Sequence, residues 1–178
     1  MKTIVSTFAF LLLTGSLASS AFAQGAALSG IQGTAEKMAD KVQNKIMAGP
    51  VDKQERVAPG KIDKDASKEF KKTNSGLKYR ILRKSKKTKP KASDTVVAHY
   101  KGWLDSKKIF DSSYRRGEPI PFPLKGVIAG WTEGLQLIGA GGMIELDIPH
   151  ELAYGVRGRP GIPPRARLHF IVELVSIK

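Results

Sequence analysis

The sequence predicts an α+β domain in which an antiparallel β-sheet packs on one short α-helix. Two observations lead to this fold class. Several segments after residue 76 alternate apolar and polar residues, as strands with one buried face do. A single segment among them, near residues 126–138, spaces its apolar residues by three and four, as a helix does. Many antiparallel-type strands with one short helix are typical of a sheet that buries one face against that helix.

The first 23 residues have the three parts of a secretory signal peptide. Lys2 supplies the positive start, residues 4–13 are mainly apolar, and Ala21, Phe22 and Ala23 form an A-x-A cleavage site before Gln24. The apolar stretch is short for a membrane span. We therefore expect a mature chain of residues 24–178 that is exported, to a periplasm or out of the cell, with an uncleaved N-terminal anchor as the alternative.

Residues 24–72 are predicted to be a tail and a linker. Apolar residues at 28, 31, 35, 38, 42 and 46 follow a helical spacing, with Gly49 and Pro50 as a stop. This helix, over about residues 28–48, is either a nascent helix in a flexible tail or a self-association helix, so homodimerisation stays open. Residues 51–73 show no apolar periodicity and many charges, which is typical of a linker.

The linker and the front of the domain are strongly basic. Residues 61–91 contain thirteen Lys or Arg against three Asp or Glu, in a chain whose net charge is +14. Such a run is usually a solvated arm, and in an exported protein its attractive partner would be an anionic surface such as lipid headgroups or envelope polymer. No recognition-helix pattern and no interleaved aromatics accompany it, so specific nucleic-acid binding is not predicted.

Strand signals begin after Gly76. Alternating or β-rich runs cover residues 77–81, 95–104, 109–111, 143–148 and a last strand from Leu168 to Ile177. Residues 119–123 contain three prolines, which predicts an extended edge or a loop.

The predicted helix follows sheet-forming residues that end at Val127 and Ile128. Ile128, Trp131, Leu135 and Ile138 recur at spacings of three and four, and Gly139 is a plausible stop. Two to three turns are too few to be stable without a surrounding sheet. The indole of Trp131 either fills the core or forms the floor of an aromatic cavity, and the pattern alone leaves both open.

Composition excludes several classes of chemistry. The 178 residues suit one domain with an appendage, and they include no cysteine, so disulfides, thiol catalysis and zinc-thiolate sites are excluded. The three histidines are scattered without metal-ligand spacing. The sequence offers no candidate metal or cofactor site.

Five linked motifs resemble, in order and spacing, those of the FKBP-type peptidyl-prolyl cis-trans isomerases, in particular the exported bacterial type. They are VVAHYKGWL at 96–104, FDSSYRRG at 110–117, VIAGWTEGL at 127–135, IPHELAYG at 148–155, and GIPP with LHFIVEL from 161 to 174. The resemblance covers about residues 73–178 and is strongest from residue 93. It implies a twisted antiparallel sheet wrapped on the short helix, with a prolyl pocket between them.

The resemblance also implies roles for individual residues. The apolar walls around a proline ring would be Tyr100, Phe110, Val127, Ile128, Trp131 and Phe170, with Ile162 closing one side. Asp111 and the Tyr154 hydroxyl would be polar groups at the rim, and the Ile128 N–H would hold a substrate carbonyl. Ile120 and Arg159 depart from the commonest family pattern at the rim, which affects sequence preference and affinity for macrolide inhibitors more than activity.

The predicted function is acceleration of rotation about X-Pro bonds in unfolded or partly folded exported proteins. Rotation breaks amide resonance but makes no bond, so a catalyst needs an apolar pocket and a few fixed donors instead of a nucleophile, metal or cofactor. One alternative is a proline-binding module or holdase chaperone, which would use the pocket for binding and have little need for catalysis. Another is a surface or adhesion protein whose basic arm does the main work.

Overall fold

A computed structural model describes residues 49–178. The predicted signal peptide at 1–23 and the predicted helix at 28–48 lie outside the described residues. None of the helices within residues 49–178 has the length and apolar content that crossing a bilayer requires.

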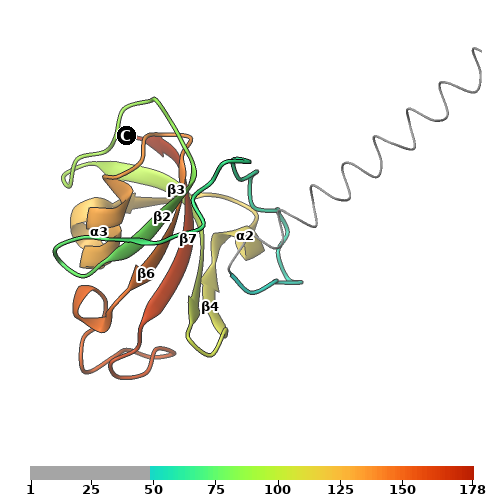
Figure 1. The fold of residues 1–178 in the computed structure, drawn as a ribbon. Coiled ribbons are helices and arrows are strands. Elements are labelled where there is room, and N and C mark those ends of the chain that lie inside the picture. Colours follow the sequence, from blue (N-terminus) through green and yellow to red (C-terminus); the bar gives the residue numbers. More distant parts are fainter. Residues whose placement is uncertain (1–48) are drawn as a thin grey trace, which may run out of the picture. The chain divides into compact units, whose positions relative to one another are not determined.

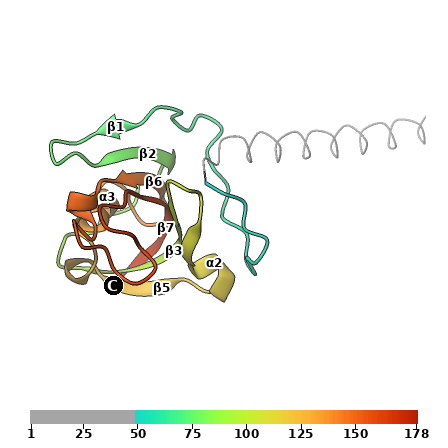
Figure 2. The same cartoon turned by 90° about the horizontal axis from the view of Figure 1, so that it is seen from below.

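One antiparallel sheet dominates residues 49–178 (Figures 1 and 2). Its strand order is β1-β2-β6-β7-β3-β4, and β5 pairs with β3 beside that path. Its strands are β1 Lys71–Lys72, β2 Lys78–Arg83, β3 Thr95–Leu104, β4 Ile109–Ser112, β5 Ile120–Pro123, β6 Met143–Ile148 and β7 Leu168–Ile177. The predicted antiparallel sheet is thereby confirmed.

Four short helical segments complete the fold. They are the α-helices α2 Ser113–Arg116 and α3 Ala129–Leu135 and the 3₁₀ turns η1 Leu124–Gly126 and η2 His150–Leu152. The twisted sheet curves around α3, which lies on its concave side in both views (Figures 1 and 2).

The proline-rich segment at 119–123 is an edge strand, as expected. β5 pairs with the first half of β3, where Val96 faces Phe122, while β4 pairs with the second half, where Gly102 faces Asp111. Prolines are tolerated at such an edge because they need not donate to a further strand.

The helix α3 has seven residues, about two turns, which is the lower end of the predicted length. It ends at Leu135, and the chain continues in tight turns in which the Ile138 N–H donates to the Leu135 carbonyl at 3.4 Å. Ile138 is nevertheless buried. A spacing of three residues is met equally well by such i to i−3 turns, so the apolar pattern continues past the last residue of α3.

Two glycines let α3 lie directly on β6. A Cβ at Gly130 would come within 2.5 Å of Ile148 Cγ2, and one at Gly134 within 2.7 Å of Leu146 Cδ2. No side chain can be accommodated at these distances without movement of the core, so the glycines set the depth at which α3 sits in the sheet.

The alternation of each strand gives the sheet two different faces. The concave face carries the main core around α3, which includes Tyr100, Leu135, Leu146, Phe170 and Val172. The opposite face carries a second buried cluster made by Ile62, Leu82, Trp103, Met143 and Ile171.

Residues 49–70, here called the strap, lie on this second face (Figure 1, teal). Glu55 of the strap pairs with the buried Lys101 of β3 at 3.1 Å, and the Gly60 N–H donates to Glu173 of β7 at 2.6 Å. The sequence predicts a linker here because it shows no apolar periodicity. The contacts of the strap are made by polar groups and by Ile62, its one buried residue, and these produce no periodic pattern. The domain boundary at residue 73 stays a prediction.

Candidate functional site

A pocket of about 630 Å³ opens between α3 and the concave face of the sheet. Four strands, β3, β4, β5 and β7, contribute to it together with the end of η1, the start of α3 and the loop after η2. Its lining consists of Tyr100, Phe110, Asp111, Phe122, Gly126, Val127, Ile128, Ala129, Trp131, Ala153, Tyr154, Arg159 and Phe170.

Trp131 forms the floor of the pocket. Its side chain is 4% exposed, and the rings of Tyr100, Phe122 and Phe170 meet it edge to face at 5.2 to 5.3 Å between centroids. Such T-shaped contacts are the favoured arrangement of aromatic pairs. The indole nitrogen has no hydrogen-bond partner within residues 49–178. The result is a rigid, apolar cup of aromatic rings.

Asp111 is held at the rim by two partners. Its carboxylate accepts from the Tyr100 hydroxyl at 2.5 Å and from Arg116 at 2.7 Å, and Arg116 also donates to the Tyr100 oxygen at 2.6 Å. Partial burial acts to raise the pKa of Asp111, but the hydrogen bonds from Tyr100 and Arg116 and the Arg116 charge outweigh it and lower that pKa. Burial and the neighbouring carboxylate raise the pKa of Tyr100. Asp111 is therefore an anion that orients the Tyr100 ring.

Two residues of the pocket lining carry groups that can donate a hydrogen bond to a ligand. The Ile128 N–H precedes α3 and donates to no acceptor within residues 49–178. The Tyr154 hydroxyl accepts a hydrogen bond from Arg159 at 2.9 Å. Because a phenol carries one proton of its own, Tyr154 can accept from Arg159 and still donate to a ligand.

Most residues predicted for the site lie together. Tyr100, Phe110, Asp111, Val127, Ile128, Trp131, Tyr154 and Phe170 all line the pocket. Ile162 does not: it is 6% exposed and packs into the main core instead.

Phe122 was missed as a wall of the pocket. Its ring contacts both Trp131 and Tyr100 edge to face. The alternation of Ile120 and Phe122 could have predicted a strand with both side chains on one face. The three prolines of the segment instead favoured an extended edge or a loop. Nothing within residues 49–178 groups three or more metal-binding side chains.

A family model described as FKBP-type peptidyl-prolyl cis-trans isomerase matches residues 86–175. The isomerase FkpA of Escherichia coli is 55% identical over 111 residues, which cover 62% of this chain and 41% of that protein. FkpA of Aeromonas hydrophila is 40% identical over 162 residues, covering 82% and 60%.

Two solved structures show the same fold. The crystal structure of Escherichia coli FkpA matches with a TM-score of 0.60 and 41% identity, covering 87% of this chain and 68% of that one. A peptidyl-prolyl cis-trans isomerase from Pseudomonas syringae matches with a TM-score of 0.58 and 32% identity, covering 80% and 95%. This chain spans 41% to 60% of the length of the two curated relatives.

Proposed function

Because the chain belongs to the FKBP-type peptidyl-prolyl cis-trans isomerases, we propose that it accelerates rotation about X-Pro bonds in unfolded or partly folded proteins. The observation that carries the proposal is the aromatic cup in which Tyr100, Phe122 and Phe170 meet Trp131 edge to face. A pocket of this kind accepts a proline ring and offers its amide an apolar surface.

The chemistry needs selective binding of a twisted amide. The barrier to rotation is about 18–20 kcal/mol, and the uncatalysed reaction takes tens to hundreds of seconds. A planar amide is charge-separated and is stabilised by water, so transfer into the aromatic cup weakens its resonance. Every tenfold of rate requires about 1.4 kcal/mol of preference for the twisted state. Burial of the proline ring, with about three methylenes at roughly 0.8 kcal/mol each, gives only weak and promiscuous binding.

We assign the fixed donors to the Ile128 N–H and the Tyr154 hydroxyl. Both belong to the pocket lining, and both have a proton available for a substrate carbonyl. Asp111 acts by orienting Tyr100 and by its negative charge at the rim. Ile162 anchors the turn that carries Arg159 and does not itself line the pocket.

An isomerisation assay on short X-Pro peptides tests this function. We expect Trp131→Ala and Tyr154→Phe each to lower kcat/KM by about tenfold or more, which corresponds to about 1.4 kcal/mol per factor of ten. Tyr79→Phe is the matched control, because Tyr79 packs against the same core without lining the pocket. A folded wild-type protein that accelerates none of several X-Pro peptides would leave a proline-binding or holdase role instead.

We propose that macrolide inhibitors such as rapamycin occupy the same cup. Binding should change the fluorescence of Trp131, whereas Trp103 lies in the second cluster on the opposite face of the sheet and should not respond. The change should therefore vanish in Trp131→Phe and persist in Trp103→Phe. An equal response in both variants would contradict this placement.

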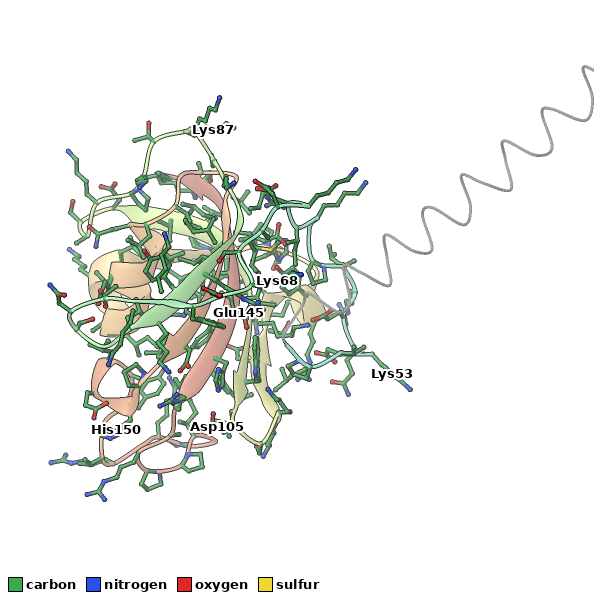
Figure 3. The ribbon with its side chains drawn as sticks, in the orientation of Figure 1. Lys53, Lys68, Lys87, Asp105, Glu145 and His150 are labelled. Carbon is green, nitrogen blue, oxygen red and sulfur yellow. The ribbon has the colours of Figure 1, made fainter. Side chains whose placement is uncertain are left out.

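We propose that the basic segment at 61–91 attracts an anionic surface. Lys84 pairs with Asp65, but Lys86, Lys87 and Lys89 are exposed without an ion pair in the described part of the chain. Lys87, within this segment, extends away from the sheet on its loop (Figure 3). Binding to vesicles with anionic lipid should weaken steeply with salt and fall in a variant with Gln at 86, 87 and 89. Equal binding to neutral vesicles would contradict an electrostatic origin.

We propose that residues 1–23 direct export and are then removed, which leaves a tail and basic linker at 24–72 and an isomerase domain at 73–178. The support is the signal-peptide pattern of the sequence. Mass spectrometry of the chain purified from an expressing cell's envelope fraction should find Gln24 as the first residue. A mature chain that still starts at Met1 would contradict cleavage.

A further inference from the structure

Arg159 stands in a tight turn at the rim of the pocket. The Arg159 N–H donates to the Ile162 carbonyl at 3.0 Å, and the Ile162 N–H donates back at 2.8 Å. Between them, Pro160 and Gly161, whose φ is +82°, have the sequence and backbone preference of a type II turn. The buried side chain of Ile162 fixes this turn to the main core. The backbone of Arg159 is thus rigidly placed although its side chain is exposed.

The guanidinium of Arg159 is also fixed at its far end. It donates to the Tyr154 hydroxyl at 2.9 Å, and its central carbon lies 4.9 Å from the centre of the Tyr154 ring. Stacking on an aromatic ring together with a hydrogen bond restricts an otherwise mobile side chain.

The charge of Arg159 is not neutralised by the protein. Within residues 49–178 it makes no ion pair, whereas the other arginine near the pocket, Arg116, pairs with Asp111 at 2.7 Å. The same loop carries Arg157 and Arg165, for which the described residues supply no carboxylate partner either. The rim beside Tyr154 is therefore a site of uncompensated positive charge.

We propose that Arg159 is a specificity-determining residue that selects substrates with an acidic side chain adjoining the proline. This inference rests on the proposed isomerase function and adds to it a substrate class. If the Tyr154 hydroxyl donates to a substrate carbonyl, that carbonyl lies two hydrogen bonds away from the Arg159 guanidinium. If the substrate residue directly before or directly after the proline is a glutamate, its carboxylate can reach the guanidinium while the proline stays in the pocket.

The size of the preference follows from exposure. A solvent-exposed Arg and carboxylate pair contributes modestly, which corresponds to roughly a twofold to fivefold difference in binding. Salt should suppress it, because the Debye length falls to about 3 Å at 1 M ionic strength. Glutamine is the proper comparison for glutamate, since it has the same shape and no charge.

The test compares kcat/KM for peptide pairs that differ only by Glu against Gln, placed directly before the proline in one pair and directly after it in another. For wild type, we expect a Glu to Gln ratio of about three or more in at least one pair at low salt, falling toward one at 1 M salt. Arg159→Gln should bring that ratio to one, Arg159→Lys should retain most of it, and Arg159→Glu should invert it. The ratio is insensitive to any general loss of activity caused by a disturbed Tyr154.

Arg157→Gln is the matched control, because it removes the same charge from the same loop at a position that does not line the pocket. It should leave the ratio within twofold of wild type. Ratios near one for both wild-type pairs, with all four peptides accelerated, overturn this inference and leave the isomerase function intact. If none of the four peptides is accelerated, both are overturned.

Discussion

At the level of single residues, Glu173 is the carboxylate that connects the strap to the sheet. It accepts from the Gly60 N–H at 2.6 Å, from the Tyr114 hydroxyl at 2.7 Å and from Arg83 at 2.9 Å. Burial acts to raise the pKa of Glu173, but these three donors and the charge of Arg83 outweigh it and lower that pKa below 4.5.

Glu173→Gln should therefore destabilise the protein and change its response to acid. A carboxylate with a lowered pKa contributes stability that is fully present above its unfolded value, near 4.5, and is lost as the pH falls through the folded value. We expect a loss of about 2–3 kcal/mol at pH 7, where charged hydrogen bonds are replaced, and a smaller difference near pH 3. Urea unfolding at both pH values measures this, with Glu69→Gln at an exposed position as the control.

At the level of elements, the contact between α3 and β6 determines where the pocket floor lies. Gly130 and Gly134 face β6 from successive turns of α3, and Trp131 follows the first of them. Glycine weakens a helix interior by about 1 kcal/mol relative to alanine. Glycine occupies both positions because a Cβ there would come too close to Ile148 and Leu146.

Gly130→Ala tests which effect is larger. Helix propensity alone would stabilise the protein by up to about 1 kcal/mol, whereas overpacking against Ile148 should cost about 1–3 kcal/mol. We expect a net destabilisation and a reduced kcat/KM, because α3 must shift and carry Trp131 with it. Thermal unfolding and the peptide assay check this together. Gly126→Ala is the control for thermal unfolding alone, since a Cβ there meets nothing within 4 Å but Gly126 lines the pocket.

At the level of the whole molecule, the strap covers part of the second face of the sheet, so that both faces carry buried residues. It covers Trp103, supplies Glu55 to Lys101 and supplies the Gly60 N–H to Glu173. Lys101 is 4% exposed, so removal of Glu55 would leave a buried cation without its partner. The strap thus packs on the sheet through a segment in which the sequence predicts a linker.

A fragment of residues 71–178, which keeps β1, should consequently be less stable than one of residues 49–178. Losing the strap exposes the second cluster and unpairs Lys101, which together should cost at least about 3 kcal/mol. Within the longer fragment, Ile62→Ala should cost about 2 kcal/mol and Val57→Ala, at a position 40% exposed, under 0.5 kcal/mol. Equal unfolding midpoints for the two fragments would show that the strap contributes nothing.

The sequence by itself determined the sheet and most of the site. Strict alternation placed Tyr100 and Phe170 on one face of their strands, and a spacing of three and four identified the helix that carries Trp131. These features are local, since each depends on the period of a single strand or helix and is visible in about ten consecutive residues. The linked motifs added the identity of the pocket walls.

The tertiary structure alone decided the rest. Phe122 becomes a wall because β5 pairs with β3, Arg159 reaches the rim because the buried Ile162 anchors its turn, and Gly60 meets Glu173 from 113 residues away. None of these contacts involves residues at a regular spacing in the sequence, so no periodic pattern predicts them. They arise because strand pairing and core packing bring distant segments together, and that three-dimensional arrangement also places the strap on the second face of the sheet.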